Sequence, residues 1–381
     1  MGLGFFKNKI IMLMKRIFTL FIAIAGILTA NAQSTGFYHV KNTYTDRYMM
    51  MTDNSKGGSV SGSPDLAAIT STKNKDVAFT HPGAVCYIVS VGGGKYDVQA
   101  QNTGLHNVAG IYGDVKANSD GTYSISGTYS GITIKLGDKL NGGSENSWLV
   151  EAGSNNGKWS FLAIDNNTEY IGIKPDVKDG DGNYWGTMYC GFAFKLHSSG
   201  MKAYYVDNAN ASNFSLTEWT NDVIPANMPI IIKCSSSDYS NNKIKPVTDK
   251  ASEPSYGKYQ LYGVYFDRGK DESGDKHINH KAYDSNTMRV IGVNGGKLVF
   301  EKASSSYLTD GAYLPHNKAY LEVPSGSNAT LTQGTVGIQN ITADNKQINE
   351  GTYNLTGQKI PDAGTLRPGI YIQNGKKFVV K

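Results

Sequence analysis

The sequence GFYHV at residues 36–40 returns as GKYDV at 94–98 and as GKWSF at 157–161. Each copy begins with glycine, has an aromatic residue at its third position, and ends on an apolar residue. A polar turn and a second strand-like stretch follow each copy, which is typical of β-hairpins. Repeats about 60 residues apart, none able to bury its apolar face alone, predict three hairpin units around an approximate threefold axis.

The composition also favours strands over helices. The chain of 381 residues contains 24 Tyr and 44 Gly, and aromatic residues are enriched in strands while glycine is enriched in tight turns. Ile132, Ile134 and Leu136 alternate with polar residues behind a similar stretch at 123–126, as in half-buried antiparallel strands. We therefore predict an all-β protein, long enough for two or three domains.

A basic and apolar leader precedes the repeats. Two basic residues at 15–16 are followed by an apolar run at 17–28 and by Ala30-Asn31-Ala32, the small-residue pattern that signal peptidase requires. The run is shorter than the roughly 20 residues of a membrane-spanning helix. No cysteine follows it that could carry a lipid anchor. We expect residues 1–32 to be a signal peptide, with Met14 as an alternative start.

Removing the leader changes the electrostatic character of the chain. The formal charge falls from +5 to +1, because the leader holds four basic residues and no acidic one. A nearly neutral protein lacks the positive surface expected of a nucleic-acid binder. We therefore expect a protein exported through the periplasm to the cell surface or beyond, with no nucleic acid among its partners and no transmembrane segment in its mature form.

Three cysteines remain in the exported chain: Cys86, Cys190 and Cys234. Cys86 and Cys190 lie in apolar runs that look like buried strands, and cysteine is among the most buried residue types. We expect core thiols. The pair Cys190 and Cys234 is the one combination that merits a test for a disulfide, since export permits oxidation.

A second region, residues 176–324, contains the further hairpin signal Asn294-Gly295-Gly296, between apolar runs at 288–293 and 297–300. Its stretches at 186–194 and 288–293 resemble a recurrent β-rich domain of Bacteroidota surface proteins, a family without an established catalytic function. This resemblance implies a sandwich-type domain. The first region, 33–175, contains FYHVKN at 37–42 and Arg47-Tyr48, and resembles β-trefoil modules of secreted proteins.

The last stretch, LRPGIYIQNGKKFVVK at 366–381, is a hairpin by local chemistry, with Asn374-Gly375 as its turn. It resembles the C-terminal sorting domain of the type IX secretion system of the Bacteroidota. The resemblance implies that residues 325–381 are a linker and a small β-sandwich tail that the secretion machinery recognises. The positions that carry the resemblance are Pro368, Gly369, Tyr371, Gly375, Lys376 and Lys381.

Two segments contain residues that bind metals in other proteins. Asp179, Asp181 and Asn183 alternate as in a calcium loop, but the sharp-turn glycine and the bidentate glutamate of that loop are absent. His277 and His280 lie in a charged stretch whose spacing fits no zinc motif. We interpret the first segment as a turn and the second as a solvated loop, and we expect neither a metal nor another cofactor.

Aromatic residues near turns are the remaining candidates for ligand binding, because a flat ring with a polar edge suits stacking on a sugar. Core packing is the competing interpretation for each ring. The candidates are Tyr44, Tyr48, Tyr112, Tyr184, Trp185 and Trp219.

No nucleophile elbow or paired cysteine and base is present in the sequence. We therefore predict a secreted or surface binding protein without catalytic residues, which recognises a glycan or a host surface protein. A secreted glycoside hydrolase, another hydrolase or its accessory protein, and a structural or adhesive surface component are the alternatives.

Overall fold

The computed structural model describes residues 33–51, 69–101, 103–104, 114–129, 132–138, 145–146, 150–151, 155–254, 259–264, 281–309, 311–334, 352–354, 359–360, 368–373 and 376–380. The chain divides into two compact units, Met1–Gly334 and Thr335–Lys381. Nearly all regular structure within these ranges is β, so the prediction of a multi-domain all-β protein is confirmed. No helix in these ranges is both long and apolar enough to span a membrane.

Some of the predictions fall on residues that lie outside the described ranges. They concern the leader at 1–32, Tyr112, His277, His280, Gly375 and Lys381.

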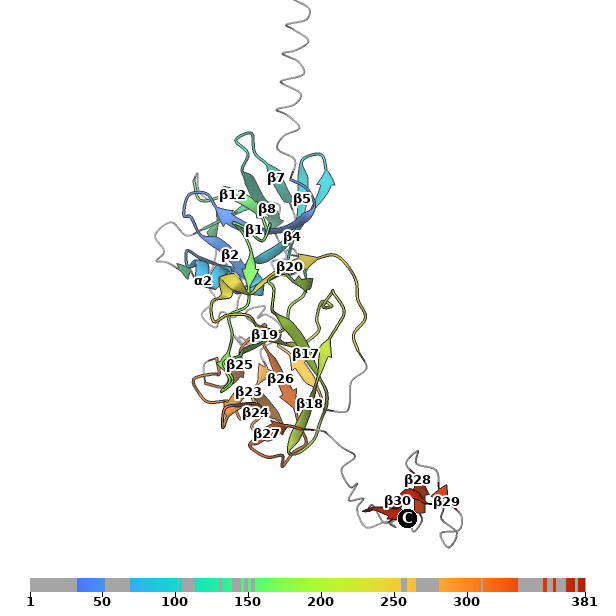
Figure 1. The fold of residues 1–381 in the computed structure, drawn as a ribbon. Coiled ribbons are helices and arrows are strands. Elements are labelled where there is room, and N and C mark those ends of the chain that lie inside the picture. Colours follow the sequence, from blue (N-terminus) through green and yellow to red (C-terminus); the bar gives the residue numbers. More distant parts are fainter. Residues whose placement is uncertain are drawn as a thin grey trace, which may run out of the picture. The chain divides into compact units, whose positions relative to one another are not determined.

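A closed ring of six antiparallel strands, called the barrel below, forms the first half of unit 1 (Figure 1). This half is called the barrel half. Each strand pairs with two neighbours, and β12 closes the ring by pairing with both β1 and β8. The three copies of the repeated pentapeptide fall on β1, β5 and the beginning of β12. In ring order the strands are β1 (Gly36–Asn42), β4 (Val85–Gly92), β5 (Lys95–Ala100), β7 (Asp114–Ala117), β8 (Tyr123–Tyr129) and β12 (Trp159–Ala163).

Aromatic rings fill much of the ring of strands. Tyr123 stacks on Phe161 with ring centroids 4.0 Å apart, and Tyr96 meets Tyr123 edge-on at 5.2 Å. Trp159 is fully buried, and its indole N–H donates to the carbonyl of Leu136 at 3.0 Å. Large apolar rings contribute much of the free energy of core burial, so the aromatic position of the repeated pentapeptide supplies part of this core.

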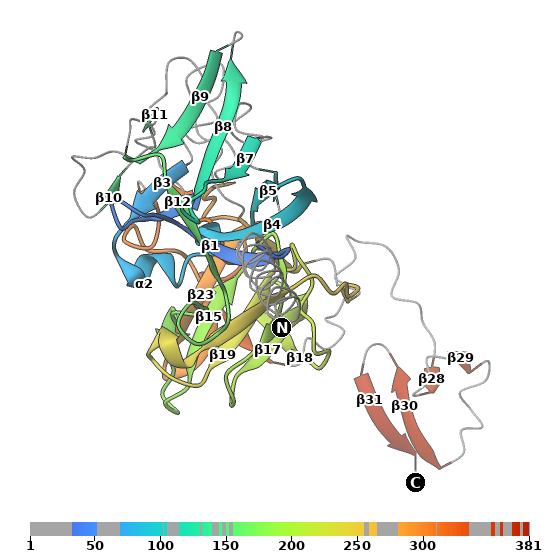
Figure 2. The same ribbon diagram turned by 90° about the horizontal axis from the view of Figure 1, so that it is seen from above.

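Further strands and a short helix extend the ring. Figure 2 shows β8 and β9 (Ile132–Gly137) as a long hairpin, which confirms the strands predicted from the alternating apolar residues. The other elements are β2 (Tyr48–Met51), β3 (Ile69–Thr72), β6 (Thr103–Gly104), β10 (Glu145–Asn146), β11 (Val150–Glu151), the helix α2 (Lys75–Ala78) and the 3-10 turn η2 (Pro82–Ala84).

A buried carboxylate ties the β2–β3 hairpin to the end of β9. Asp138 is fully buried and accepts hydrogen bonds from Arg47 Nη1 at 2.9 Å, from Ser71 Oγ at 2.6 Å and from Thr45 Oγ1. Arg47 is itself only 2% exposed. A buried charge is tolerated only when it is paired and hydrogen-bonded, so this polar cluster fixes how the hairpin sits on the barrel.

A ten-stranded sheet forms the second half of unit 1, and one of its pairings, between β18 and β27, is parallel. The hairpin of β23 and β24 turns at Gly295 and Gly296, both with positive φ, so the predicted hairpin is confirmed. In sheet order the strands are β14 (Val177–Lys178), β15 (Tyr184–Met188), β19 (Ile230–Cys234), β17 (Lys202–Ala209), β18 (Asn213–Trp219), β27 (Thr330–Gln333), β24 (Lys297–Glu301), β23 (Met288–Asn294), β26 (Ala319–Glu322) and β21 (Leu261–Gly263).

Two smaller sheets complete this half of unit 1. They contain β13 (Ile171–Gly172), β20 (Lys243–Val247) and β16 (Ala193–Leu196), and separately β22 (Lys281–Ala282) and β25 (Tyr313–Leu314). The 3-10 turn η3 (Tyr239–Asn241) precedes β20. Because β27 belongs to the large sheet, this half continues to Gly334, beyond the turn at Ser325-Gly326.

An apolar cluster joins the two halves of unit 1. Val85 of β4 is buried among residues of the second half, and the ring of Phe37 lies 6.0 Å from that of Phe192. Phe37 of β1 therefore packs against the second half, while its neighbours Tyr38 and Val40 are buried within the first half.

Unit 2 contains a four-stranded sheet in the order β29 (Lys359–Ile360), β28 (Thr352–Asn354), β30 (Gly369–Gln373) and β31 (Lys376–Val380). The pairing of Gln373 with Lys376 leaves two residues for the connection between β30 and β31. The predicted terminal hairpin is confirmed.

Candidate functional site

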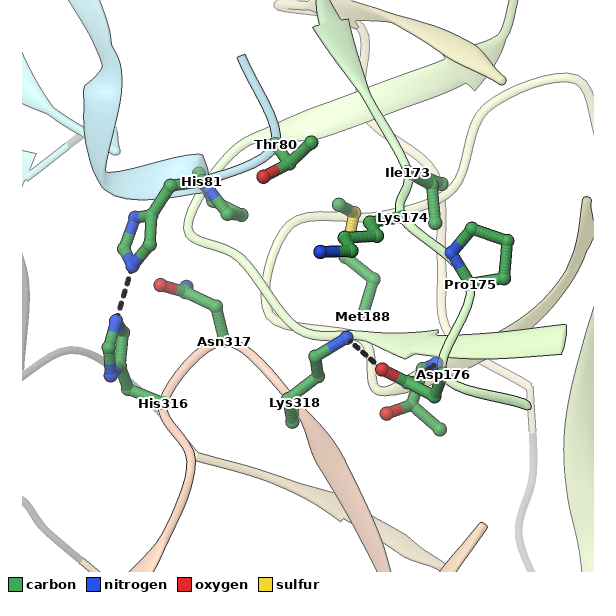
Figure 3. Close-up of a pocket in the computed structure, with 12 residues that line it drawn as sticks. Thr80, His81, Ile173, Lys174, Pro175, Asp176, Met188, His316, Asn317 and Lys318 are labelled. Atoms are coloured by element: carbon green, nitrogen blue, oxygen red, sulfur yellow. Dashed lines mark hydrogen bonds and ion pairs between the residues drawn. The ribbon is translucent and has the colours of Figure 1, made fainter. Parts of the chain in front are cut away.

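A pocket of about 370 Å³ lies where the two halves of unit 1 meet. Four separate segments of the chain contribute to it, at 80–82, 173–176, 187–188 and 316–318 (Figure 3). Its size falls within the usual range for small-molecule sites, which are frequent at domain junctions. The residues that line it are Thr80, His81, Pro82, Ile173, Lys174, Pro175, Asp176, Thr187, Met188, His316, Asn317 and Lys318.

A pair of buried amides holds the two sides of this junction pocket together. Asn317 Nδ2 donates to Gln101 Oε1 at 2.9 Å and to the carbonyl of Tyr189 at 2.8 Å. Both Gln101 and Asn317 have left-handed backbones, with φ of 48° and 57°. Both donor hydrogens of Asn317 Nδ2 are therefore committed to the joint and are not available to a ligand.

Two histidines, one from each half, meet at one wall of the junction pocket. His81 Nε2 and His316 Nε2 are hydrogen-bonded, and Figure 3 shows the two rings facing each other. The backbone N–H of Gly83 donates to His81 Nδ1 at 2.9 Å. In the neutral state His81 therefore carries its proton on Nε2 and donates it to His316.

The single carboxylate of the junction pocket is fully engaged. Asp176 Oδ1 accepts a hydrogen bond from Lys318 Nζ at 2.6 Å, and Oδ2 accepts one from the backbone N–H of Thr187 at 2.9 Å. The side-chain exposures of Lys318 and Asp176 are 28% and 15%, so this ion pair is largely shielded from solvent. Asp176 thus fixes Lys318 at the edge of the pocket.

Lys174 is the one exposed side chain among these groups. Its ammonium is directed toward the middle of the residues drawn in Figure 3. Among the described residues it has neither an ion-pair partner nor a hydrogen-bond partner for its Nζ. Ile173, Met188 and Pro175 form an apolar wall beside it. The pocket therefore combines an apolar wall with an open cationic group.

A second, more open hollow of about 590 Å³ lies elsewhere in unit 1. Its lining includes several serines, but much of their capacity is used internally. Asn242, for example, accepts hydrogen bonds from Ser235 Oγ and from the backbone N–H groups of Ser235 and Ser236. The lining residues are Asn166, His197, Ser198, Ser199, Ser235, Ser236, Ser240, Asn241 and Lys243.

The predicted aromatic candidates do not converge on one surface. Tyr44 is 60% exposed in a turn of the barrel half, whereas Tyr48 is buried at 2%. Burial, and then the carboxylate of Glu169, raise the pKa of Tyr48, whose hydroxyl donates to Glu169 Oε1 at 3.3 Å. Tyr48 is therefore part of the core and cannot stack on an external ligand.

The other three described rings lie in the second half of unit 1 and are half-buried. Tyr184 and Trp185 are adjacent on β15 and pack against different apolar clusters. Trp219 on β18 donates its indole N–H to the carbonyl of Val223 at 3.1 Å. Each of these rings has a packing role, and none of them lines the junction pocket.

The calcium-like segment forms a turn around Asp179. This carboxylate accepts hydrogen bonds from the backbone N–H groups of Asp181 and Asn183 and from the side chains of Asn183 and Trp185. Desolvation alone would raise the pKa of Asp179, but these hydrogen bonds outweigh it and the pKa is lowered. Asp181 pairs with Lys297 at 3.1 Å. The described residues hold no group of three or more potential metal-ligating His, Cys, Asp or Glu side chains.

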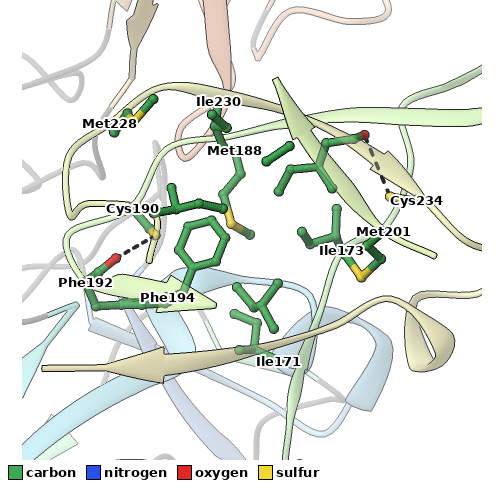
Figure 4. Close-up of a cluster of buried hydrophobic side chains, with 14 of the residues drawn as sticks. Ile171, Ile173, Met188, Cys190, Phe192, Phe194, Met201, Met228, Ile230 and Cys234 are labelled. Atoms are coloured by element: carbon green, nitrogen blue, oxygen red, sulfur yellow. Dashed lines mark hydrogen bonds between the residues drawn. The ribbon is translucent and has the colours of Figure 1, made fainter. Parts of the chain in front are cut away.

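The cysteines are free and buried, so the prediction of core thiols is confirmed and no disulfide joins Cys190 to Cys234. Figure 4 shows those two in the apolar cluster of the second half. Cys190 Sγ donates to the carbonyl of Phe192 at 3.4 Å. Burial raises the pKa of all three thiols, including Cys86, to about 12.

The described sorting-like residues of unit 2 lie on or beside the terminal hairpin. Pro368 is exposed just before β30, Gly369 begins that strand, and Lys376 begins β31. The ring of Tyr371 lies 5.9 Å from that of Phe378 on the neighbouring strand.

Sequence reasoning missed the junction pocket. Its lining residues form no recognisable sequence motif and come from segments that lie far apart in the chain. One local signal exists: Pro315-His316-Asn317 has the residue types of a turn, and the left-handed Asn317 of that turn reaches Gln101. The turn was predictable, but its partner 216 positions away was not.

Comparisons with known proteins add little to this description. No protein-family model and no curated protein matches the chain. A solved structure described as a mosquitocidal holotoxin has 14% sequence identity and a TM-score of 0.25, over 76% of this chain and 34% of that one. This chain therefore corresponds to about a third of the toxin chain, and a likeness at this level bears on neither fold nor function.

Proposed function

We propose that this chain is an exported, non-catalytic binding protein that recognises a glycan or a host surface component. The observation that carries the proposal is the junction pocket, which both halves of unit 1 build and which combines an apolar wall with convergent polar groups. Sites for small ligands have this combination. The pocket contains one carboxylate, Asp176, and it is engaged by Lys318 and Thr187.

The hydrolase alternative requires different chemistry. Most glycoside hydrolases use two carboxyl groups, about 5 to 10 Å apart across the scissile bond. The junction pocket holds one acidic side chain and the serine-rich hollow holds none. The buried thiols have raised pKa values, which disfavour a nucleophilic thiolate. Binding is therefore the function that these two hollows support better.

Two further proposals concern the context in which binding takes place. The barrel half is a trefoil-type module, supported by the six-stranded ring and by the three pentapeptide copies on β1, β5 and β12. The leader and the terminal hairpin serve export to the cell surface, supported by their sequence patterns. Under this proposal the secretion machinery is a partner of unit 2, and unit 1 contacts the ligand.

A glycan array probed with the chain lacking residues 1–32 tests the proposed function. We expect binding to a restricted set of glycans, reduced by substitutions in the junction pocket. An array without any bound glycan would exclude the glycan version and leave a protein ligand or the adhesive alternative. Release of sugar from any arrayed glycan would instead favour the hydrolase alternative.

A further inference from the structure

Two lysines of the junction pocket, Lys174 and Lys318, keep open hydrogen-bond donors. Asp176 uses both oxygens on Lys318 and on Thr187. An ammonium has three N–H donors, so Lys318 keeps two of them after its bond to Asp176. Lys174 keeps all three within the part of the chain that the structure describes.

The charges in the junction pocket also favour a ligand that accepts hydrogen bonds. Lys174 and Lys318 carry two positive charges, and Asp176 carries one negative charge. Because Asp176 is paired with Lys318, the positive charge of Lys174 is left uncompensated in the pocket. Such a site favours a ligand that carries an anionic group and several hydrogen-bond acceptors.

The apolar wall restricts the ligand further. Ile173 and Met188 are 3% and 4% exposed and belong to the buried apolar cluster, so the half-buried Pro175 is the apolar side chain that a ligand can reach beside Lys174. A purely inorganic anion would make no apolar contact with Pro175. A sugar ring offers C–H groups to an apolar wall and hydroxyl groups to the polar side, and an acidic sugar adds a carboxylate.

We propose that the junction pocket binds the carboxylate of an acidic sugar, with Lys174 as its principal partner and Lys318 as a second donor. This proposal rests on the proposed binding function and narrows its ligand class to saccharides that carry a carboxylate. Whether the acidic sugar is free or is a unit within a longer glycan does not alter the contacts in the pocket.

Isothermal titration calorimetry with defined probes tests the proposal. The protein is the chain lacking residues 1–32, and the probes are D-galacturonate, D-glucuronate, N-acetylneuraminate, the uncharged methyl ester of galacturonic acid, and D-galactose. We expect at least one acidic sugar to bind, with an affinity that falls as salt concentration rises. We expect its ester or neutral counterpart to bind about tenfold more weakly or worse, since a charge-assisted hydrogen bond is lost. An oligogalacturonide compared with galacturonate separates a glycan-borne unit from the free sugar.

Two matched variants assign the effect to the junction pocket. Lys174→Gln removes the open ammonium at an exposed position, and we expect about a tenfold loss of affinity for the acidic sugar with unchanged thermal stability. Lys245→Gln makes the same charge change at an exposed position of β20, outside the pocket lining, and is expected to bind like the original chain. Lys174→Glu should abolish binding.

Three outcomes would overturn the inference. They are equal binding of an acid and its ester, equal loss of affinity in the Lys174→Gln and Lys245→Gln variants, and no binding of any acidic sugar or oligogalacturonide. If neutral glycans bind on the array while acidic sugars do not bind in solution, the ligand class is wrong and the binding function stands. If nothing binds in either experiment, the proposed recognition of a glycan is excluded as well.

Discussion

Each half of unit 1 contains a fully buried cluster, and the two clusters differ in chemistry. In the barrel half, the charged pair Arg47 and Asp138 is 2% and 0% exposed and is surrounded by hydroxyl donors. In the second half, an equally buried cluster around Met188 and Ile230 is apolar (Figure 4). Equal burial therefore does not imply equal response to substitution, because a polar cluster depends on each partner and an apolar cluster depends on its filled volume.

The sharpest test of this difference is Arg47→Met. We expect a loss of about 3–5 kcal/mol in the free energy of unfolding, since Asp138 would be left as an uncompensated buried charge. Urea denaturation followed by tryptophan fluorescence measures this loss. The double variant Arg47→Met with Asp138→Leu should recover part of it, because an apolar pair leaves no unpaired charge. A double variant less stable than Arg47→Met would show that the cluster does not behave as an ion pair.

Ile230→Ala tests the apolar side of the comparison. Truncation of a buried isoleucine costs about 2–5 kcal/mol through lost burial and a residual cavity. Ile230 is 0% exposed, so an effect well within that range is expected in the same denaturation assay. The conservative Ile230→Val variant should cost about 0.5–1.5 kcal/mol. Equal costs for the two variants would contradict a volume-dependent response.

Gln101→Ala probes the joint between the halves. It leaves Asn317 with one fewer partner in a buried setting, and a buried unsatisfied polar group costs about 1–3 kcal/mol. Gln99→Ala is the matched control, because Gln99 bonds Asp97 within the barrel half at 2.8 Å and does not cross the joint. We expect the Gln101 variant alone to weaken acidic-sugar binding, since the junction pocket depends on both halves being in place.

The thiols give the smallest effect, a difference in reactivity without a change in fold. Burial raises the pKa of Cys86, Cys190 and Cys234 to about 12, so few thiolates exist at pH 8. We expect no reaction with Ellman's reagent in the native protein and three reactive thiols per chain in guanidinium. One rapidly reacting thiol in the native state would show that its half opens locally.

Local chemistry was enough to predict much of the fold. The hairpin turns at Gly295-Gly296 and after Gln373 were predicted because turn residues and alternating apolar positions are set within a few neighbours. The core position of the thiols followed from the apolar runs around them.

The polar cluster and the junction pocket could not be predicted in the same way. Asp138 reaches Arg47 across 91 positions, and Asn317 reaches Gln101 across 216. The sequence spacing around Asp138 and Gln101 does not identify their partners. These contacts form only when separate strands close into a barrel or when the two halves pack together. The position of Tyr48 next to a turn in the sequence suggested an exposed ring, but the folded chain buries this ring in the core.

The left-handed backbones of Gln101 and Asn317 have a consequence for how this molecule could change over time. A left-handed backbone costs about 1–2 kcal/mol for most residues other than glycine and less for asparagine, and Gln101 and Asn317 at the joint share one hydrogen-bond network. Glycine at either position would remove this backbone cost but also the amide hydrogen bond that joins the two halves. Lys174 takes no part in this network, so a change at Lys174 would alter the charge of the junction pocket and leave the joint between the halves intact.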